Sequence, residues 1–276
     1  MAKLFGFVQF DFAGTLSLAE GRYLVGTPDS GEETVLVLQR LGTPVLTERK
    51  RRRARPAPAE PEPAPVALSR ATVIRAASPL ENQEEAARWL DQTCEEEDMV
   101  DVLAAEATKI LNRALHAQAV AAADPYGRQL SAEHAERVLI GYGSGEETAD
   151  GRFTDGRKVD VGPRTASRRR RREEQLRPQE RVSAVLRGRE QLDACETLLL
   201  RARADLDAGR TREAALQLRV GLEALLAELD DAVDDPDHQA DLASLREERS
   251  GDQRASIEDR LETAERILRR RRVLGS

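Results

Sequence analysis

The sequence contains few aromatic residues and only two cysteines, and both shortages exclude classes of protein. Aromatic residues make up 3% of the 276 positions. A large ligand pocket is therefore not expected, because such pockets are usually lined with aromatic side chains. Cys94 and Cys195 lie far apart in the sequence, which predicts neither a disulfide framework nor a zinc site. A reducing cytoplasm is the expected location.

Long apolar segments are also missing. No stretch of about 18 consecutive apolar residues occurs, so we expect no transmembrane segment. Gln9 and Asp11 interrupt the apolar run near the N-terminus, and no basic segment precedes that run. This pattern argues against a secretory signal. Together these absences favour a cytoplasmic protein.

Histidine and cysteine, which often carry catalysis or bind metals, are sparse, and the abundant carboxylates are not by themselves evidence of an acid–base pair. The histidines His116, His134 and His238 lack the spacing, to one another or to a cysteine, that is typical of a metal site. The glycine-rich stretch 141–145 is followed by no Lys-Ser or Lys-Thr pair, so it predicts an ordinary turn rather than a P-loop. We expect no enzymatic activity, no catalytic residue, no metal site and no cofactor.

One short segment occurs twice. Ser30–Thr34 has the same five residues as Ser144–Thr148. A match of this length is a common turn composition and does not predict a duplicated domain.

The overall charge excludes one kind of partner. The chain has 43 basic and 50 acidic residues, and its net charge is -7. This balance excludes a uniformly basic nucleic-acid-binding protein but allows a locally basic one. Nearly all of the basic residues are arginine, an excess that is typical of a bacterium with a GC-rich genome.

Positive charge is concentrated in two segments rich in arginine. They contain Arg49, Lys50, Arg51, Arg52 and Arg53, and Arg168, Arg169, Arg170, Arg171 and Arg172. Arginine binds phosphate through its planar fork, so these residues are candidates for contacts with a nucleic-acid backbone. Other interpretations stay open, namely solvated linkers, pairing with the acidic residues of 81–98, or contacts with an anionic membrane surface.

Hydrophobic patterning predicts an α+β protein with several parts. We expect a small N-terminal β-meander (1–48), a Pro/Arg linker (49–66), an α+β unit (67–162), an Arg-rich linker (163–178) and a helical bundle (179–276). Within them, strands are expected at 4–12, 22–25, 34–39, 44–47, 67–76 and 136–142, and residues 143–163 as an irregular segment or a hairpin. Ser78 and Glu81 form a capping box that predicts one long helix over 79–123, with a break near residue 97. Whether the strands before and after 49–66 share one sheet is left open.

The C-terminal part shows three apolar stripes at helical spacing. The first has Leu192, Cys195, Leu198, Leu199, Ala202 and Leu206, the second Leu218, Leu222, Leu225, Leu226 and Leu229, and the third Ile257, Leu261, Ala264 and Leu268. Three such stripes predict a bundle of helices.

A helical hairpin is expected within residues 196–229. Gly209 permits a tight turn, Ala214 and Gly221 permit close approach of the helices, and Leu218 and Leu222 are expected to be buried. This pattern resembles a tetratricopeptide repeat, and it resembles equally the helical hairpin of the HEPN family. The first resemblance implies a protein-interaction module. The second implies a relation to ribonucleases, although no Arg followed closely by His occurs after Gly209.

These observations favour a non-enzymatic protein-interaction or adaptor protein, whose partner is another protein. The alternative is sequence-nonspecific nucleic-acid binding through the two arginine-rich segments. An enzyme with an unrecognised site, such as a degenerate nuclease, is the third hypothesis.

Overall fold

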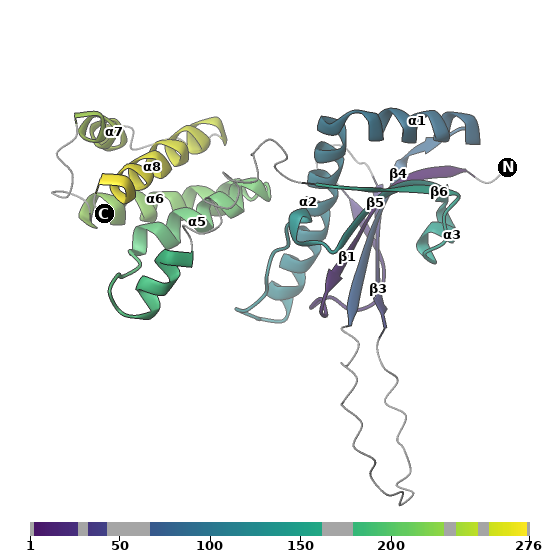
Figure 1. The fold of residues 1–276 in the computed structure, drawn as a ribbon, viewed down its shortest axis with the longest axis horizontal. Helices are drawn as coiled ribbons and strands as arrows, with labels where there is room; N and C mark the ends of the chain where they lie inside the picture. Colours follow the sequence, from purple (N-terminus) through teal and green to yellow (C-terminus); the bar gives the residue numbers. More distant parts are fainter. Residues whose placement is uncertain are drawn as a thin grey trace, which may run out of the picture. The chain divides into compact units, whose positions relative to one another are not determined.

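The chain forms two compact units, each with its own hydrophobic core. The computed structural model describes residues 3–26, 33–42, 67–161, 179–228, 236–247 and 254–274. Unit 1 is Met1–Arg164 and unit 2 is Thr165–Ser276. Unit 1 combines a sheet with helices, whereas the described part of unit 2 is helical (Figure 1). The expected mixture of helices and strands is confirmed.

Unit 1 is built on one antiparallel sheet of six strands in the order β2-β3-β4-β1-β5-β6. The strands are β1 (Leu4–Ala13), β2 (Gly21–Gly26), β3 (Glu33–Leu41), β4 (Leu68–Leu80), β5 (Arg137–Ser144) and β6 (Asp155–Val159). The strands before and after residues 49–66 therefore share one sheet. A separate N-terminal meander does not form, because β1 pairs with β4 and β5 rather than with β2.

β1 occupies the middle of the sheet because both of its faces are buried. Val8 and Phe10 belong to the core on one face, and Phe7 belongs to the core on the other. A strand that is removed from water on both faces needs a hydrogen-bonded neighbour along each edge. Alternation of residue types therefore identified the strand, whereas its neighbours come from distant parts of the chain.

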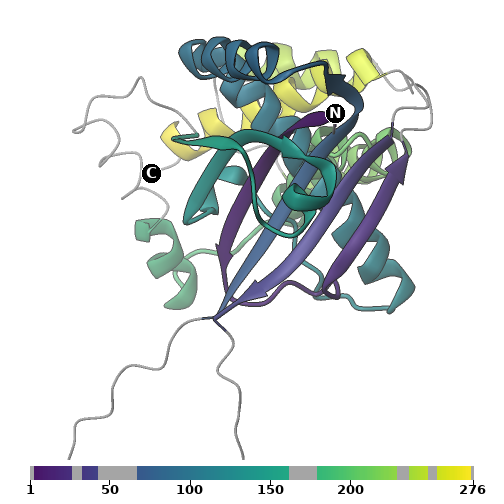
Figure 2. The ribbon, with the colours of Figure 1, turned by 90° about the vertical axis from the view of Figure 1, so that its right-hand side faces the viewer.

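Helices cover the two faces of the sheet unequally. α1 (Gln83–Glu95) and α2 (Glu97–Ala121) pack on one face, where Leu90, Leu103 and Leu111 join the core. On the other face, the described residues place only the short helix α3 (Gly145–Ala149) against the sheet (Figure 2). A single 3-10 turn, η1 (Ala132–His134), precedes β5.

The helix expected over 79–123 begins later, and it is divided in two next to the expected break near residue 97. Pairing of β4 with β1 continues to Leu80, which lies opposite Leu4, so Ser78 of the expected capping box lies in a strand and Glu81 follows its end. Asn82 is the N-cap instead, and its side chain accepts a hydrogen bond from the Glu85 amide at 2.9 Å. Extended backbone at Glu96 separates α1 from α2. Long-range strand pairing thus overrides a local helix signal.

Unit 2 contains α5 (Ala194–Asp207), α6 (Thr211–Glu228), α7 (Pro236–Glu247) and α8 (Arg254–Leu274), with a further helical segment at 179–186. α5 and α6 form a hairpin, and their inner faces pack with α7 and α8 in one core. The expected third stripe, Ile257 to Leu268, is buried as predicted. Leu192 of the expected first stripe is exposed, because it precedes the first residue of α5 and so lies outside the helical periodicity.

None of the described helices is long and apolar enough to cross a membrane. The expected strand 44–47 lies outside the described residues.

Candidate functional site

The sequence-based candidates fall into two groups in the structure. Arg49–Arg53 and Arg168–Arg172 lie outside the described residues. The hairpin residues are described: Gly209 has a φ of +77° in the turn, and Ala214, Leu218, Gly221 and Leu222 are buried on α6.

Gly221 lies at a close contact between the two helices of the hairpin. A Cβ atom placed on Gly221 would lie 3.2 Å from two side-chain carbons of Leu199 and 3.3 Å from the Cβ of Leu198. These distances are shorter than ordinary van der Waals contacts. The glycine therefore lets α5 and α6 approach closely, which makes it a packing position rather than a chemical one.

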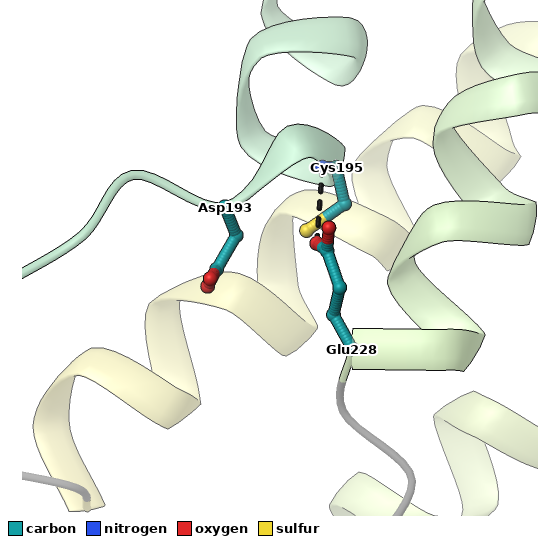
Figure 3. Close-up of side chains that lie close together, drawn as sticks. All are labelled: Asp193, Cys195 and Glu228. Carbon is teal, nitrogen blue, oxygen red and sulfur yellow. Dashed lines mark hydrogen bonds between the residues drawn. The ribbon is translucent and has the colours of Figure 1, made fainter.

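A cluster that sequence reasoning missed lies where α5 begins and α6 ends. Asp193, Cys195 and Glu228 bring one ligand atom each within 4.8 Å of the others (Figure 3). Carboxylates and a thiol are donors that zinc accepts. Glu228 is more than thirty positions from the other two residues in the sequence, and the spacing of motif residues gives no signal for such a pair.

The geometry of this cluster is that of a helix cap contributed by a neighbouring helix. The Glu228 carboxylate accepts hydrogen bonds from the backbone amides of Ala194 and Cys195, each at 3.1 Å. Asp193 occupies the N-cap position of α5, but its own side chain makes no capping bond. Glu228 thus satisfies two amides that the helix start leaves open, and its negative charge lies at the positive end of the helix.

The Cys195 thiol is buried and protonated at neutral pH. Burial raises the pKa of Cys195 to about 12, and its hydrogen bond to Glu228 raises the pKa in the same direction. The thiolate is the form that attacks substrates and binds metals. A protonated thiol that donates to a carboxylate therefore favours a structural role for the cluster, which ties α5 to α6.

The raised pKa of Cys195 predicts that unit 2 loses stability in alkaline solution. In the unfolded chain the thiol ionises near its usual pKa of 9.0, whereas in the fold it stays protonated to about 12. The stabilisation is thus complete below pH 9 and is lost as the pH rises from about 9 to 12. We expect the midpoint of thermal unfolding, followed by circular dichroism, to fall more steeply with pH in the wild type than in Cys195→Ala. Equal slopes would contradict this role.

A second group of titratable residues lies between α1 and β6. Asp91 and Arg157 form an ion pair across these elements. Burial raises the pKa of Cys94, an effect that Arg157 opposes, and burial together with Asp155 and Asp91 raises the pKa of Tyr142. Both groups are therefore protonated at neutral pH. This arrangement is typical of an ion pair that fastens a helix to an edge strand.

Polar groups are also buried on the sheet face that carries α3. Arg70 donates two hydrogen bonds to Asp11, at 2.8 and 3.0 Å, from the neighbouring strand. Thr72 and Gln9 form a second cross-strand pair at 3.3 Å, and Gln39 donates to the carbonyl of Ala149 at the end of α3. The hydrogen bond from Gln39 holds α3 on the sheet, whereas the other two pairs join β4 to β1.

The glycine-rich stretch 141–145 has a packing role. A Cβ atom on Gly141 would lie 2.7 Å from the Phe7 ring, and one on Gly143 would lie 2.6 Å from the Thr148 hydroxyl. The glycines therefore make room for side chains that cover this end of the sheet. The repeated five-residue segment is not a structural repeat, since Thr34 lies in β3 and Thr148 in α3.

The histidines give no site in the described part of the chain. His116 on α2 and His134 in η1 are both exposed to solvent.

Comparison with known proteins adds no relationship. The sequence matches no protein-family model and no curated protein, and the fold matches no solved structure.

Proposed function

We propose that this chain is a non-enzymatic protein-interaction or adaptor protein, and that the outer face of α6 binds another protein. The observation that carries the proposal is the exposure of Leu216 and Val220, which are 50% and 45% exposed. They are four residues apart and so lie on the same face of the helix. Exposed apolar neighbours of this kind favour a binding surface.

The opposite face of α6 explains why these residues are free to bind a partner. Ala214, Leu218, Leu222 and Leu225 fill the core of unit 2. The core is therefore complete without Leu216 and Val220. Removal of an apolar side chain from water is favourable, so a partner that covers these two residues gains binding free energy.

Two further features support this proposal over an enzymatic role. The hairpin of α5 and α6 is similar to a tetratricopeptide unit, which implies protein binding. The thiols of Cys94 and Cys195 have raised pKa values, opposite to the direction that activates a nucleophile. The cluster around Glu228 is better explained as a helix cap than as a catalytic or metal site.

Nucleic-acid binding is the second candidate, and one feature of the sheet favours it. β3 ends at Leu41 and β6 ends at Val159, and the pairing registers place both at the same end of the sheet. Four strand spacings separate them, about 19 Å. The sequences that follow contain Arg49–Arg53 and Arg168–Arg172. Two arginine-rich segments of one chain can contact the same polyanion, which strengthens binding.

Affinity capture from the native host at physiological salt tests both candidates. We compare the wild type with the double variant Leu216→Lys/Val220→Lys and with the control Val120→Lys, which changes an apolar residue of unit 1 that is 68% exposed. The proposal predicts a specific protein whose recovery falls about tenfold or more in the double variant only, as expected for residues central to an interface.

The outcomes of this capture separate the two functions. Recovery of no specific protein, or equal recovery by the double variant, contradicts binding through α6. Captured material that is lost after nuclease treatment, and that the double variant captures as well as the wild type does, favours the second candidate, nucleic-acid binding.

A further inference from the structure

The two edge strands of the sheet differ in how they are protected against pairing with another strand. β6 carries Asp155, Arg157 and Lys158 within five residues, and charged side chains are a common protection of a sheet edge. β2, at the other edge, has the sequence Gly-Arg-Tyr-Leu-Val-Gly. Its central Leu24 is 67% exposed. An edge of six residues with an exposed leucine at its middle favours pairing with a further strand.

β2 is held firmly in position by the rest of unit 1. The Tyr23 hydroxyl donates to the Ala19 carbonyl at 2.8 Å, and the Arg113 guanidinium on α2 donates to the Gly26 carbonyl at 2.9 Å. The side chains of Tyr23 and Val25 pack against the core beneath α2. Because the strand is already ordered, pairing with another strand costs little conformational entropy.

We infer that β2 is the interface of a homodimer, in which two copies of this chain pair their β2 strands antiparallel about a twofold axis at Leu24. In this register Leu24 lies opposite Leu24 of the second copy, and Tyr23 lies opposite Val25. Each pair shares one face of the joined sheet, since residues of the same parity point the same way. Aromatic residues and β-branched residues pair favourably across strands. β2 is thus complementary in shape to itself, which a twofold interface requires.

The charges beside β2 do not oppose this pairing. In the same register, Arg22 lies opposite Gly26 of the second copy, and Gly26 pairs with Glu33 on β3. Arg22 of one copy therefore lies on the same face of the joined sheet as Gly26 and the exposed Glu33 of the second copy. Gly26, which lies between the other two, has no side chain. Arg22 is already paired with Asp150 of its own chain at 2.6 Å, and Glu33 of the second copy would lie two strand spacings from it, about 10 Å. Arg22 is the one charged side chain of β2, and in this register β2 places no like charges opposite one another.

Disulfide cross-linking of the full chain tests this register. Residues directly opposite in an antiparallel pair have Cα atoms about 4.5–5.5 Å apart, a distance that a disulfide spans. Leu24→Cys is therefore expected to give a covalent dimer under mild oxidation, with a peptide linking position 24 to itself. Arg22→Cys is the matched control on the same strand and face. In this register its two cysteines are about 13 Å apart along the strand, so it should cross-link no more than the wild type.

Sedimentation analysis tests the dimer without an introduced cysteine. The wild type should associate in a concentration-dependent manner, and Leu24→Lys should weaken the dimer about tenfold or more, because it places like charges opposite one another. Leu24 is mostly exposed, and circular dichroism checks that the variant keeps the fold. A wild type that stays monomeric, or equal cross-linking of Leu24→Cys and Arg22→Cys, overturns the inference. The pairing does not depend on α6, so its failure leaves the proposed function untouched.

Discussion

Gly141→Ala is expected to lower the free energy of unfolding of unit 1 by about 3 kcal/mol. A Cβ atom at this position would lie 2.4 Å from the carbonyl oxygen of Asp155, 2.7 Å from the Phe7 ring and 2.9 Å from the Cα of Gly156. Two of these atoms belong to the backbone of β6, which cannot rotate out of the way. The methyl group must therefore separate β5 from β6 or displace a phenylalanine that is fully buried.

Denaturation by urea, followed by tryptophan fluorescence, measures this loss in unit 1 alone. Trp89 is the only tryptophan of the chain, and it packs against the core of unit 1. Gly26→Ala is the matched control, because a Cβ on this strand glycine would have no atom within 4 Å. The control should change stability by less than about 0.5 kcal/mol. Similar losses for the two variants would contradict the packing role of Gly141.

Arg70→Met is expected to destabilise unit 1 by about 3 kcal/mol or more. The side chains of Asp11 and Arg70 are 8% and 18% exposed and form a two-pronged ion pair. Removal of the guanidinium leaves a carboxylate buried without its partner, which costs far more than the pair itself contributes. The double variant Asp11→Leu/Arg70→Met removes both charges and should recover much of the loss.

The same fluorescence measurement distinguishes this buried pair from an exposed one. Arg22→Met breaks the ion pair with Asp150, whose two side chains are each 52% exposed. Such pairs contribute about 0–1 kcal/mol, so this control should unfold almost like the wild type. The interpretation fails if Arg70→Met is no more destabilising than Arg22→Met, or if the double variant is less stable than Arg70→Met.

Local signals in the sequence identified elements well where neighbours along the chain determine them. Alternation of apolar residues identified β1, and helical spacing identified the stripe from Ile257 to Leu268. The helix signal at Ser78 failed because Ser78 lies in β4. The last residue of this strand, Leu80, pairs with Leu4, more than seventy positions away. The strand order was equally inaccessible, because it depends on contacts between distant segments.

The sequence revealed less of the candidate site. The cap formed by Glu228 on the amides of Ala194 and Cys195 joins the ends of two helices, and no spacing rule relates these residues. The role of Gly141 was also missed, since a glycine in a strand is typical of turns and of close packing alike. Gly209 and Gly221, by contrast, lie where the hairpin pattern predicted a turn and a close helix approach.

The central claim, that unit 2 binds a protein through the outer face of α6, is tested most directly by photo-cross-linking in the native host. A photoreactive amino acid replaces Val220 in the full chain, and in a control chain it replaces the exposed Val120 of α2. The account predicts a discrete adduct with one other protein from position 220 and none from position 120. The absence of an adduct at 220, or the same adducts from both positions, would contradict it.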